Sequence, residues 1–296
     1  MTERKKATLK MIFAMSVFGT LGVFVRYIPL PSGSLAFLRG VIGVVFLLIV
    51  KAIKRSPVDF GAIKKNLLPL CLSGAFIGVN WILLFQAYKL TTVSTATLCY
   101  YMSPVFITLF SPIILRERLT VKKAVCVFTA FIGMIFVSGV FSAPENMNPA
   151  GVSCGLGAAF FYSAVVLTNK KLKDISDCDM TLFQLAAAAV VILPYTLLCE
   201  KVTAETITPL SVIMVLTVGV IHTGFTYNLY FGAIASLPAQ TSAVLGYIDP
   251  VVALILSALF LSEPLDLFGY IGAVLILGSA FISETTIRRK PLSRSK

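Results

Sequence analysis

Charged side chains are scarce in this sequence. Only 13% of the residues are Asp, Glu, Lys or Arg, and 57% are hydrophobic, whereas soluble domains carry about 25% charged residues. A water-soluble protein of 296 residues could not cover its surface with so few charges. The composition therefore excludes an ordinary cytosolic enzyme, a disordered chain and a secreted disulfide scaffold.

Long polar connections are also lacking. The longest, at 52–65, 170–179 and 200–209, are too short to form a soluble domain. Between the connections lie apolar runs of the length that crosses a bilayer as a helix, about 17–25 residues. The runs do not alternate apolar with polar residues as barrel strands do. The sequence predicts an all-α integral membrane protein with ten transmembrane helices, at 8–25, 34–51, 66–88, 92–114, 124–141, 151–169, 180–199, 210–232, 239–261 and 267–284.

Residue types that usually carry enzyme chemistry are few. There is one histidine, one tryptophan and six scattered cysteines without a C-x-x-C pair. We find no nucleotide-binding glycine loop, metal-ligand cluster or nucleophile constellation, so no enzymatic activity, cofactor or metal is expected. The cysteines are expected to act as small apolar packing residues.

Acidic residues are outnumbered by basic ones, 13 to 25, and the formal net charge is +12. The basic residues concentrate in alternate connections and at both ends of the chain, and the opposite connections hold only Arg26, Lys89 and Lys201. Basic residues in short loops mark the cytoplasmic face. This predicts a multi-pass protein of the inner or plasma membrane with both termini cytoplasmic. The basic segments are expected to contact anionic lipid rather than nucleic acid.

The sequence repeats itself at a shift of 146 residues. Without a gap, the third and fourth runs match the eighth and ninth at several positions, among them Gly78 with Gly224, Phe85 with Phe231, Tyr101 with Tyr247, Pro104 with Pro250 and Glu117 with Glu263. The first and sixth runs match more weakly, with Phe18 on Tyr162. This predicts two five-helix repeats, at 1–145 and 146–296. Five is odd, so the second repeat would be inverted in the membrane, an arrangement found in secondary transporters that work by alternating access.

Two prolines and one carboxylate fall near the centres of predicted spans. Pro104 and Pro250 each leave the carbonyl four residues earlier without its helical partner, which predicts a kinked helix beside protein or water. Asp249 directly precedes Pro250. Three roles stay open for this carboxylate: a proton carrier in coupling, a partner for a cationic group of the substrate, or a structural hydrogen-bond acceptor.

Aromatic residues gather in the same parts of the two repeats. Gly78, Trp81 and Phe85 share one helix face, and Gly224, Tyr227 and Phe231 share the corresponding face. Rings hold flat apolar molecules by stacking and cations through their quadrupole. We therefore expect a central aromatic substrate cavity, with packing against helices or lipid as the alternative, lined by Asn80, Trp81, Tyr100, Tyr101, Tyr227, Asn228, Tyr247 and Asp249.

Two further groups are candidates for coupling. Arg39 lies inside the second run near its external end, where the simplest interpretation is that its side chain snorkels to the interface. Binding a carboxylate or pairing with Asp249 is the alternative. His222 lies centrally in the eighth run, on a face other than that of Tyr227, as a hydrogen-bonded packing residue or a proton relay.

Ten spans in two inverted repeats resemble the drug/metabolite transporter superfamily, in particular its EamA branch. Local marks are Leu38-Arg39-Gly40 and the repeat ends at 115–120 and 261–266, each with a glutamate, Glu117 and Glu263. The first span departs from the family pattern, because Phe18-Gly19 stands where many relatives have Trp-Gly. The resemblance implies a carrier without an ATPase that uses a central cavity between the halves, and a structural role for the two glutamates in closing each repeat.

The sequence thus predicts a secondary active transporter of a small organic metabolite, such as an amino acid or an amine-like compound, and favours export. A proton or a counter-substrate would drive it, and the protein would be a monomer or a weak homodimer. A metabolite or nucleotide-type exchanger is the alternative, followed by a channel, which would usually need a ring of like residues from an oligomer.

Overall fold

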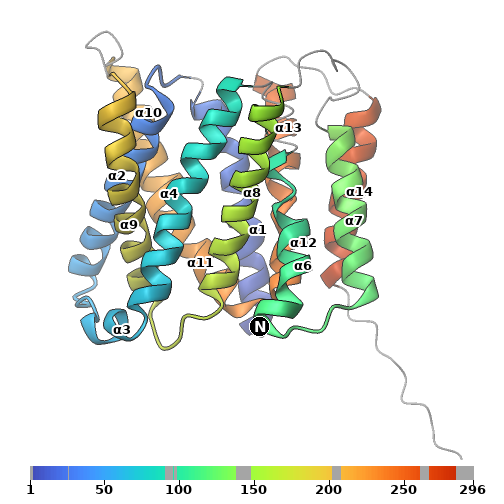
Figure 1. Cartoon of the computed structure of the whole chain (residues 1–296), viewed down its shortest axis with the longest axis horizontal. Helices are drawn as coiled ribbons and strands as arrows, with labels where there is room; N and C mark the ends of the chain where they lie inside the picture. The colour runs from blue at the N-terminus through green and yellow to red at the C-terminus, as the bar shows by residue number, and fades with distance from the viewer. Residues whose placement is uncertain are drawn as a thin grey trace, which may run out of the picture.

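The protein is a bundle of long helices, here seen in a computed structural model (Figure 1). The structure describes residues 3–25, 27–90, 96, 99–137, 148–201, 208–260 and 267–284. All regular secondary structure in these ranges is helical, which confirms the all-α prediction. Arg26, Glu263 and the basic tail after residue 284 lie outside the described residues.

The helices of the first half follow the predicted runs closely. They are α1 (Glu3–Val25), α2 (Ser32–Ile53), α4 (Leu67–Leu90), α6 (Ser103–Leu115) and α7 (Val121–Val137). The run expected at 92–114 is described as α6 with Ala96 and residues 99–102 before it. The sequence analysis missed one short helix, α3 (Phe60–Lys65), in the second connection. Asp59 caps α3 by accepting a hydrogen bond from the Ala62 N–H at 2.9 Å.

The helices of the second half also follow the predicted apolar runs. Its helices are α8 (Pro149–Asn169), α9 (Asp177–Cys199), α10 (Pro209–Thr217), η2 (Val218–Phe225), α11 (Thr226–Ser236), α12 (Ala239–Gly246), α13 (Ile248–Phe260) and α14 (Leu267–Glu284). Here α10, η2 and α11 together correspond to the run at 210–232, and α12 with α13 to the run at 239–261. The described helices are thus approximately consistent with ten spans. Five segments within the described ranges are long and apolar enough to cross a membrane by length and composition alone.

Polar caps fix where the second-half helices begin. Asn148 precedes α8 and accepts from the Ala150 N–H at 2.9 Å, with Pro149 in the first turn. Ser176 caps α9, and Thr208 with Ser211 forms a capping box at α10. Such caps satisfy N–H groups that the helix itself leaves free, worth about 0.5–2 kcal/mol each.

Two helical interruptions occur where the central prolines predicted kinks. Residues 101 and 102 form a turn before α6, whose second residue is Pro104. Tyr247 separates α12 from α13, three residues before Pro250. A proline cannot donate a backbone hydrogen bond, so the preceding turn tightens or breaks. The kink prediction is confirmed in both repeats.

The eighth span contains a π-helix, η2, that the sequence analysis did not predict. Gly219 and Gly224 are five residues apart, the hydrogen-bonding interval of a π-helix. Both press against α2: a Cβ on Gly219 would lie 2.5 Å from Ile42 Cβ, and one on Gly224 would lie 2.5 Å from the Phe46 ring. Close packing on α2 thus accompanies the wider helix.

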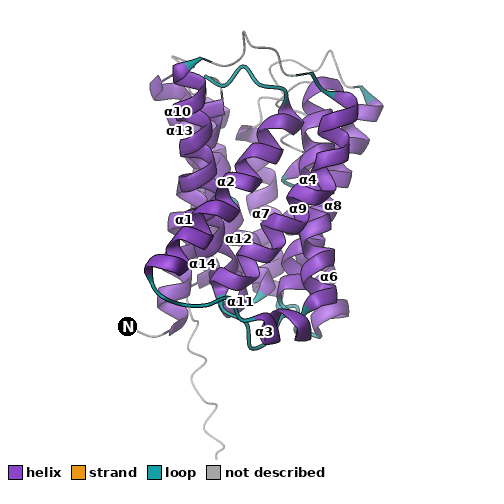
Figure 2. Ribbon diagram, turned by 90° about the vertical axis from the view of Figure 1, so that its left-hand side faces the viewer, coloured by secondary structure: helices purple, strands orange, loops and turns teal. Residues whose placement is uncertain are grey.

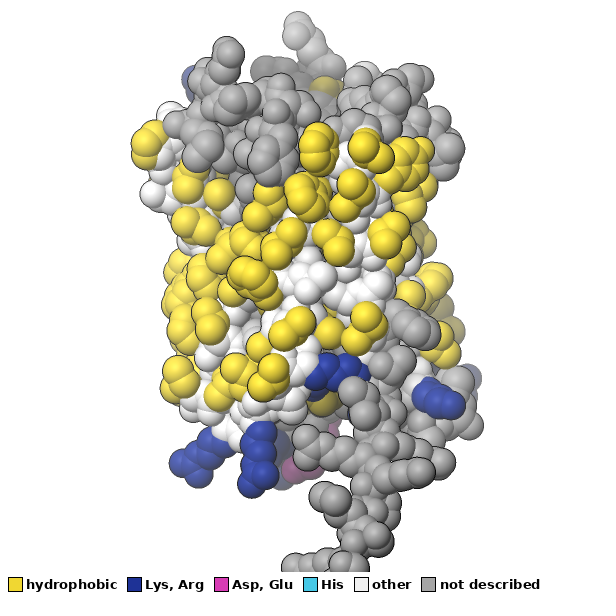
Figure 3. All heavy atoms as spheres, turned by 90° about the vertical axis from the view of Figure 1, so that its right-hand side faces the viewer, with side chains coloured by type: hydrophobic (Ala, Val, Ile, Leu, Met, Phe, Trp, Pro, Cys, Tyr) yellow, Lys and Arg dark blue, Asp and Glu magenta, His cyan; other side chains and the backbone are white. Residues whose placement is uncertain are grey.

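Helices from the two halves are interleaved. The α4 helix packs on α8 and α9, α2 on α9 and η2, and α1 on α11 and α13. Figure 2 shows the bundle from one side, with α3 at its lower end. The α7–α14 pair stands together at the opposite edge (Figure 1). On that side a wide apolar belt covers the middle of the molecule, and Lys and Arg side chains lie below it (Figure 3). An apolar belt of this kind is what a bilayer requires of a helical membrane protein.

The α2 and α9 helices are joined at both ends. At one end the Lys51 ammonium lies 2.7 Å from the Asp179 carboxylate, and both side chains are buried. At the other end the Glu200 carboxylate accepts from the Gly33 and Ser34 N–H groups, at 2.8 and 2.7 Å. A carboxylate at a helix N-terminus is favoured by the free N–H groups and the helix dipole. Two polar contacts therefore fix α2 against a helix of the other half.

Candidate substrate site

A continuous series of ring contacts runs through the middle of the bundle. Trp81 on α4 meets Tyr227 on α11 at 6.0 Å between ring centroids. From Tyr227 the contacts continue through Tyr230, Tyr162, Tyr100 and Tyr101 to Tyr247, with centroid separations of 5.6–6.4 Å. Five of the predicted site residues thus belong to one aromatic cluster, namely Trp81, Tyr100, Tyr101, Tyr227 and Tyr247.

Three members of the aromatic cluster were not selected from the sequence: Phe18, Tyr162 and Tyr230. Phe18 on α1 packs edge-on against Tyr227 at 5.0 Å and Tyr230 at 5.7 Å. The Tyr162 and Tyr230 hydroxyls form a hydrogen bond that links α8 to α11. A signal existed for two of them, because Phe18 and Tyr162 occupy matching positions in the weak alignment of the first and sixth runs. Phe18 thus supplies an aromatic contact at the position where the first span departs from the expected family pattern.

Arg39 projects from α2 into one end of the aromatic cluster. Its side chain is 5% exposed, so the snorkelling interpretation is wrong. The guanidinium carbon lies 4.1 Å from the Trp81 ring centroid and 5.9 Å from that of Tyr227. One terminal nitrogen donates a long hydrogen bond, 3.4 Å, to the Tyr227 hydroxyl. Cation–π contacts of this kind stabilise a buried cation, by about 2 kcal/mol or more when desolvated.

Asp249 lies at the other end of the aromatic cluster. Its carboxylate is hydrogen-bonded by the Tyr101 side chain, while the Tyr247 hydroxyl donates to the Tyr101 carbonyl at 3.1 Å. The backbone of Asp249 is pressed against α1, because a Cβ on Gly19 would lie 2.7 Å from the Asp249 carbonyl oxygen. Asp249 and Arg39 do not form an ion pair, so the pairing alternative is wrong. The aromatic cluster therefore has a cation at one end and a carboxylate at the other.

Other predicted residues lie outside this cluster. The Asn80 side chain is buried and donates to the Ala158 carbonyl on α8 at 2.6 Å. His222 is buried in the π-helix and faces α1: Nε2 lies 2.8 Å from the Thr20 hydroxyl, and the ring packs against Phe24 at 4.9 Å. Asn228 is half-buried, and its amide oxygen has no hydrogen-bond partner. The structure therefore favours packing for Asn80 and a hydrogen-bonded position for His222.

Glu117 connects the two halves of the chain. Its carboxylate accepts from the Ala239 N–H at 3.1 Å, at the start of α12. Next to this contact the Gln240 amide donates to the Ser111 hydroxyl at 3.3 Å and the Arg118 carbonyl at 3.4 Å. Family resemblance suggested that Glu117 closes its own repeat, whereas the observed hydrogen bond reaches into the other half.

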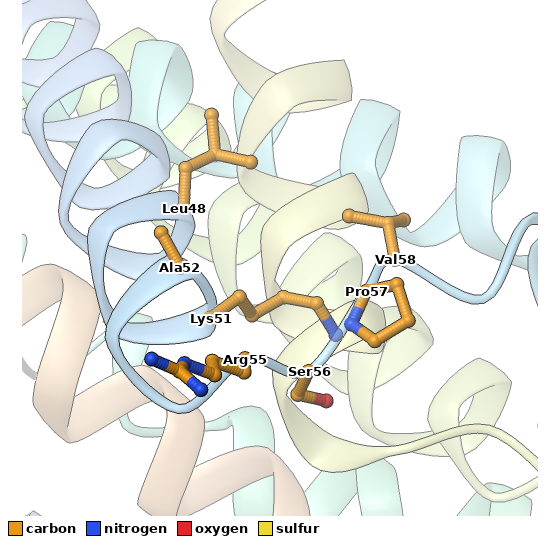
Figure 4. A pocket seen from close by; sticks show the side chains of 7 residues that line it. All are labelled: Leu48, Lys51, Ala52, Arg55, Ser56, Pro57 and Val58. Carbon is orange, nitrogen blue, oxygen red and sulfur yellow. The ribbon is translucent and has the colours of Figure 1, made fainter.

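A surface pocket of about 380 Å³ lies elsewhere, at the end of α2 (Figure 4). Residues between Leu48 and Val58 line it, including Lys51 and Arg55. None of the predicted site residues lines this pocket. Within the described ranges, no three His, Cys, Asp or Glu side chains gather where they could hold a metal ion.

The model of the EamA-like transporter family matches this chain twice, over residues 5–139 and 149–285. The chain is 27% identical to the uncharacterized transporter YxxF of Bacillus subtilis (strain 168) over 290 residues, which is 97% of this chain and 92% of the relative. It is also 27% identical to Protein PecM of Dickeya dadantii (strain 3937) over 212 residues, 70% of each chain.

One crystal structure of a protein has a similar fold. It gives a TM-score of 0.82 at 19% sequence identity and covers 94% of this chain and 97% of its own. At this identity the similarity concerns the fold alone.

Proposed function

Because the chain belongs to the EamA-like transporter family, we propose that it is a secondary active transporter that exports a small organic metabolite by alternating access. The family and the named relatives make it a transporter of the drug/metabolite type in a membrane. Substrate, direction and coupling are the proposed part. The observation that supports it is the aromatic cluster, built from both halves of the chain and bounded by Arg39 and Asp249.

The position of the cluster suits a substrate site. Its rings come from α1, α4, α8 and α11 and from the residues just before α6 and α13. In carriers with inverted repeats, the site lies between the halves near the bilayer midplane, and rocking of the halves exposes it to either side. Rings from both halves would separate and close again in such a cycle. The proposal places both termini in the cytoplasm and the coupling proton or counter-substrate at Asp249.

Some of the contacts between the two halves would have to break during this cycle, while others would persist. The bond between Glu117 and the Ala239 N–H joins residues of the two halves, and so does the Lys51–Asp179 pair. The single Glu117 contact can open at modest cost, because one hydrogen bond contributes about 0.5–1.5 kcal/mol net. The paired contacts at both ends of α2 favour movement of α2 and α9 as one unit.

Transport by purified protein in proteoliposomes tests the proposal. A panel of amino acids, amines, carboxylates and nucleosides would be assayed for uptake and for exchange, with and without a pH gradient. Trp81→Ala and Tyr227→Ala should each weaken apparent affinity about 5- to 30-fold, since ring contacts contribute about 1–2 kcal/mol. Tyr270→Ala is the matched control, because Tyr270 is an exposed ring on α14.

Two results would contradict the proposal. Failure of the wild-type protein to move any member of the panel would remove the transport assignment. Unchanged kinetics in both ring variants, with normal expression, would make these rings packing residues.

A further inference from the structure

Arg39 is a buried cation that has no carboxylate partner among the residues that the structure describes. Lys51, the other cation on α2 and also buried, lies 2.7 Å from the Asp179 carboxylate. No carboxylate among the described residues lies within 4.0 Å of the Arg39 guanidinium, and Nε has no hydrogen-bond partner at all. Buried charges in proteins are normally paired, because an unpaired charge loses its hydration without compensation. Arg39 therefore has unused capacity for an anion.

The shape of the surroundings restricts which anion fits. The centroid of the Trp81 ring lies 4.1 Å from the guanidinium carbon of Arg39. The Tyr227 hydroxyl accepts a hydrogen bond of 3.4 Å from one terminal nitrogen. The Nε–H on the edge of the guanidinium is buried and has no hydrogen-bond partner. A planar carboxylate binds such an edge through two parallel hydrogen bonds.

The charge balance points the same way. Arg39 is the one cation in contact with the aromatic cluster within the described part of the chain. Asp249 does not lie within 4.0 Å of Arg39 and is hydrogen-bonded by Tyr101, so it forms no ion pair with Arg39. One cation balances one negative charge, which suits a carboxylate better than a doubly charged phosphate.

We propose that Arg39 binds the carboxylate of the transported substrate, and that the substrate body lies against Tyr227, Tyr230 and Phe18. This inference rests on the proposed transport function and deepens it. The substrate class becomes organic monocarboxylates, including those that also carry an amine. Amines without a carboxylate are excluded.

The single tryptophan of the chain provides a direct binding signal, because Trp81 is in contact with the Arg39 side chain. The full-length protein in detergent would be titrated with isovalerate, isovaleramide and isoamylamine, which share one skeleton, and with L-leucine and L-leucinamide. Isovalerate and L-leucine should change Trp81 emission saturably. The amides and the amine should not.

Variants of Arg39 test the charge and its geometry separately. Arg39→Gln should weaken carboxylate binding about tenfold or more, the usual effect of losing a charge-assisted pair. Arg39→Lys should recover part of the affinity, since an ammonium keeps the charge but not the two-pronged geometry. Arg55→Gln, at an exposed arginine just after α2, is the matched control and should bind as the wild-type protein does.

The outcomes separate this inference from the transport proposal. Three results would overturn the inference even if the protein transports substrate in liposomes. They are equal binding of a carboxylate and its amide, undiminished carboxylate binding by Arg39→Gln, and no change in Trp81 emission with either carboxylate. The acid-to-amide comparison uses the wild-type protein and stays decisive if the variant misfolds. Arg39-dependent binding of carboxylates without transport in liposomes would instead overturn the transport proposal and leave the inference standing.

Discussion

Individual charges within the bundle differ in what surrounds them. Lys51 has a carboxylate partner, Arg39 has rings, and Asp249 has the Tyr101 side chain. Burying any charge is costly, so each must be stabilised by a neighbour or serve a function. Asp249 has a polar partner, and a structural role is therefore a real alternative to a role in transport.

Replacing Asp249 by asparagine separates its three possible roles. A proton carrier would lose transport driven by a pH gradient but keep exchange at equal concentrations, because exchange needs no net proton movement. A partner for a cationic substrate group would lose both. A structural acceptor would lose neither, since asparagine can still accept from Tyr101. The measurement is the ratio of gradient-driven to exchange flux in proteoliposomes.

We expect loss of the gradient-driven flux with exchange retained. Wild-type values for both fluxes, with Tyr270→Ala as a control variant on α14, would remove Asp249 from the mechanism.

Helix pairs within the bundle depend on small residues that let backbones approach closely. A Cβ on Gly74 of α4 would lie 2.5 Å from Ala187 Cβ and 2.8 Å from the Gln184 carbonyl on α9. Glycine at membrane helix interfaces serves this purpose in general. The close contact between α4 and α9 therefore requires glycine at position 74.

Gly74→Ala should destabilise the protein by about 1–3 kcal/mol, the usual cost of inserting a methyl group where there is no room. Gly278→Ala is the matched control, because a Cβ there meets nothing within 4 Å. That control should be neutral or slightly stabilising, since alanine favours a helix over glycine by about 1 kcal/mol. Thermal unfolding of the purified proteins in detergent measures both, and equal melting temperatures for the two variants would contradict the prediction.

The Lys51–Asp179 pair couples α2 to α9 in a manner that a double substitution can test. Removing one partner leaves a buried charge, at a cost of about 3–5 kcal/mol, whereas replacing both by apolar residues is often neutral. Lys51→Met should therefore lower the melting temperature strongly, and Lys51→Met with Asp179→Leu should restore most of it. Additive losses in the double variant would show that the pair is not coupled.

At the scale of the whole molecule, the basic residues concentrate in particular connections of the chain. This distribution predicts how the protein is oriented in the membrane. The connections at 52–65, 115–123 and 170–179, with both termini, hold most of the basic residues. Retention of basic loops in the cytoplasm sets topology in general.

Orientation can be measured with single cysteines in a background without the six native ones, of which Cys71 and Cys199 are exposed. A cysteine at Thr120 should resist membrane-impermeant maleimide in intact cells and react after permeabilisation. A cysteine at Lys201 should react from outside in intact cells. External labelling of position 120 would reverse the proposed topology.

The sequence by itself determined the helical membrane fold, most helix boundaries, the two proline-linked breaks and five of the aromatic residues of the cluster. These follow from local rules: an apolar run of bilayer length has to satisfy its backbone as a helix, and a proline has to interrupt one. Trp81, Tyr101, Tyr227 and Tyr247 could be chosen because type and spacing mark them within a single helix.

Tertiary structure alone decided which helices of the two halves meet. It brought Tyr162 and Tyr230 between the predicted rings and turned Arg39 inward under Trp81. It also directed Asn80 to a carbonyl on α8 and His222 to Thr20 on α1. The π-helix at Val218–Phe225 arises where glycines pack against α2. Each of these depends on contacts between residues far apart in the chain, about which hydropathy and periodicity carry no information.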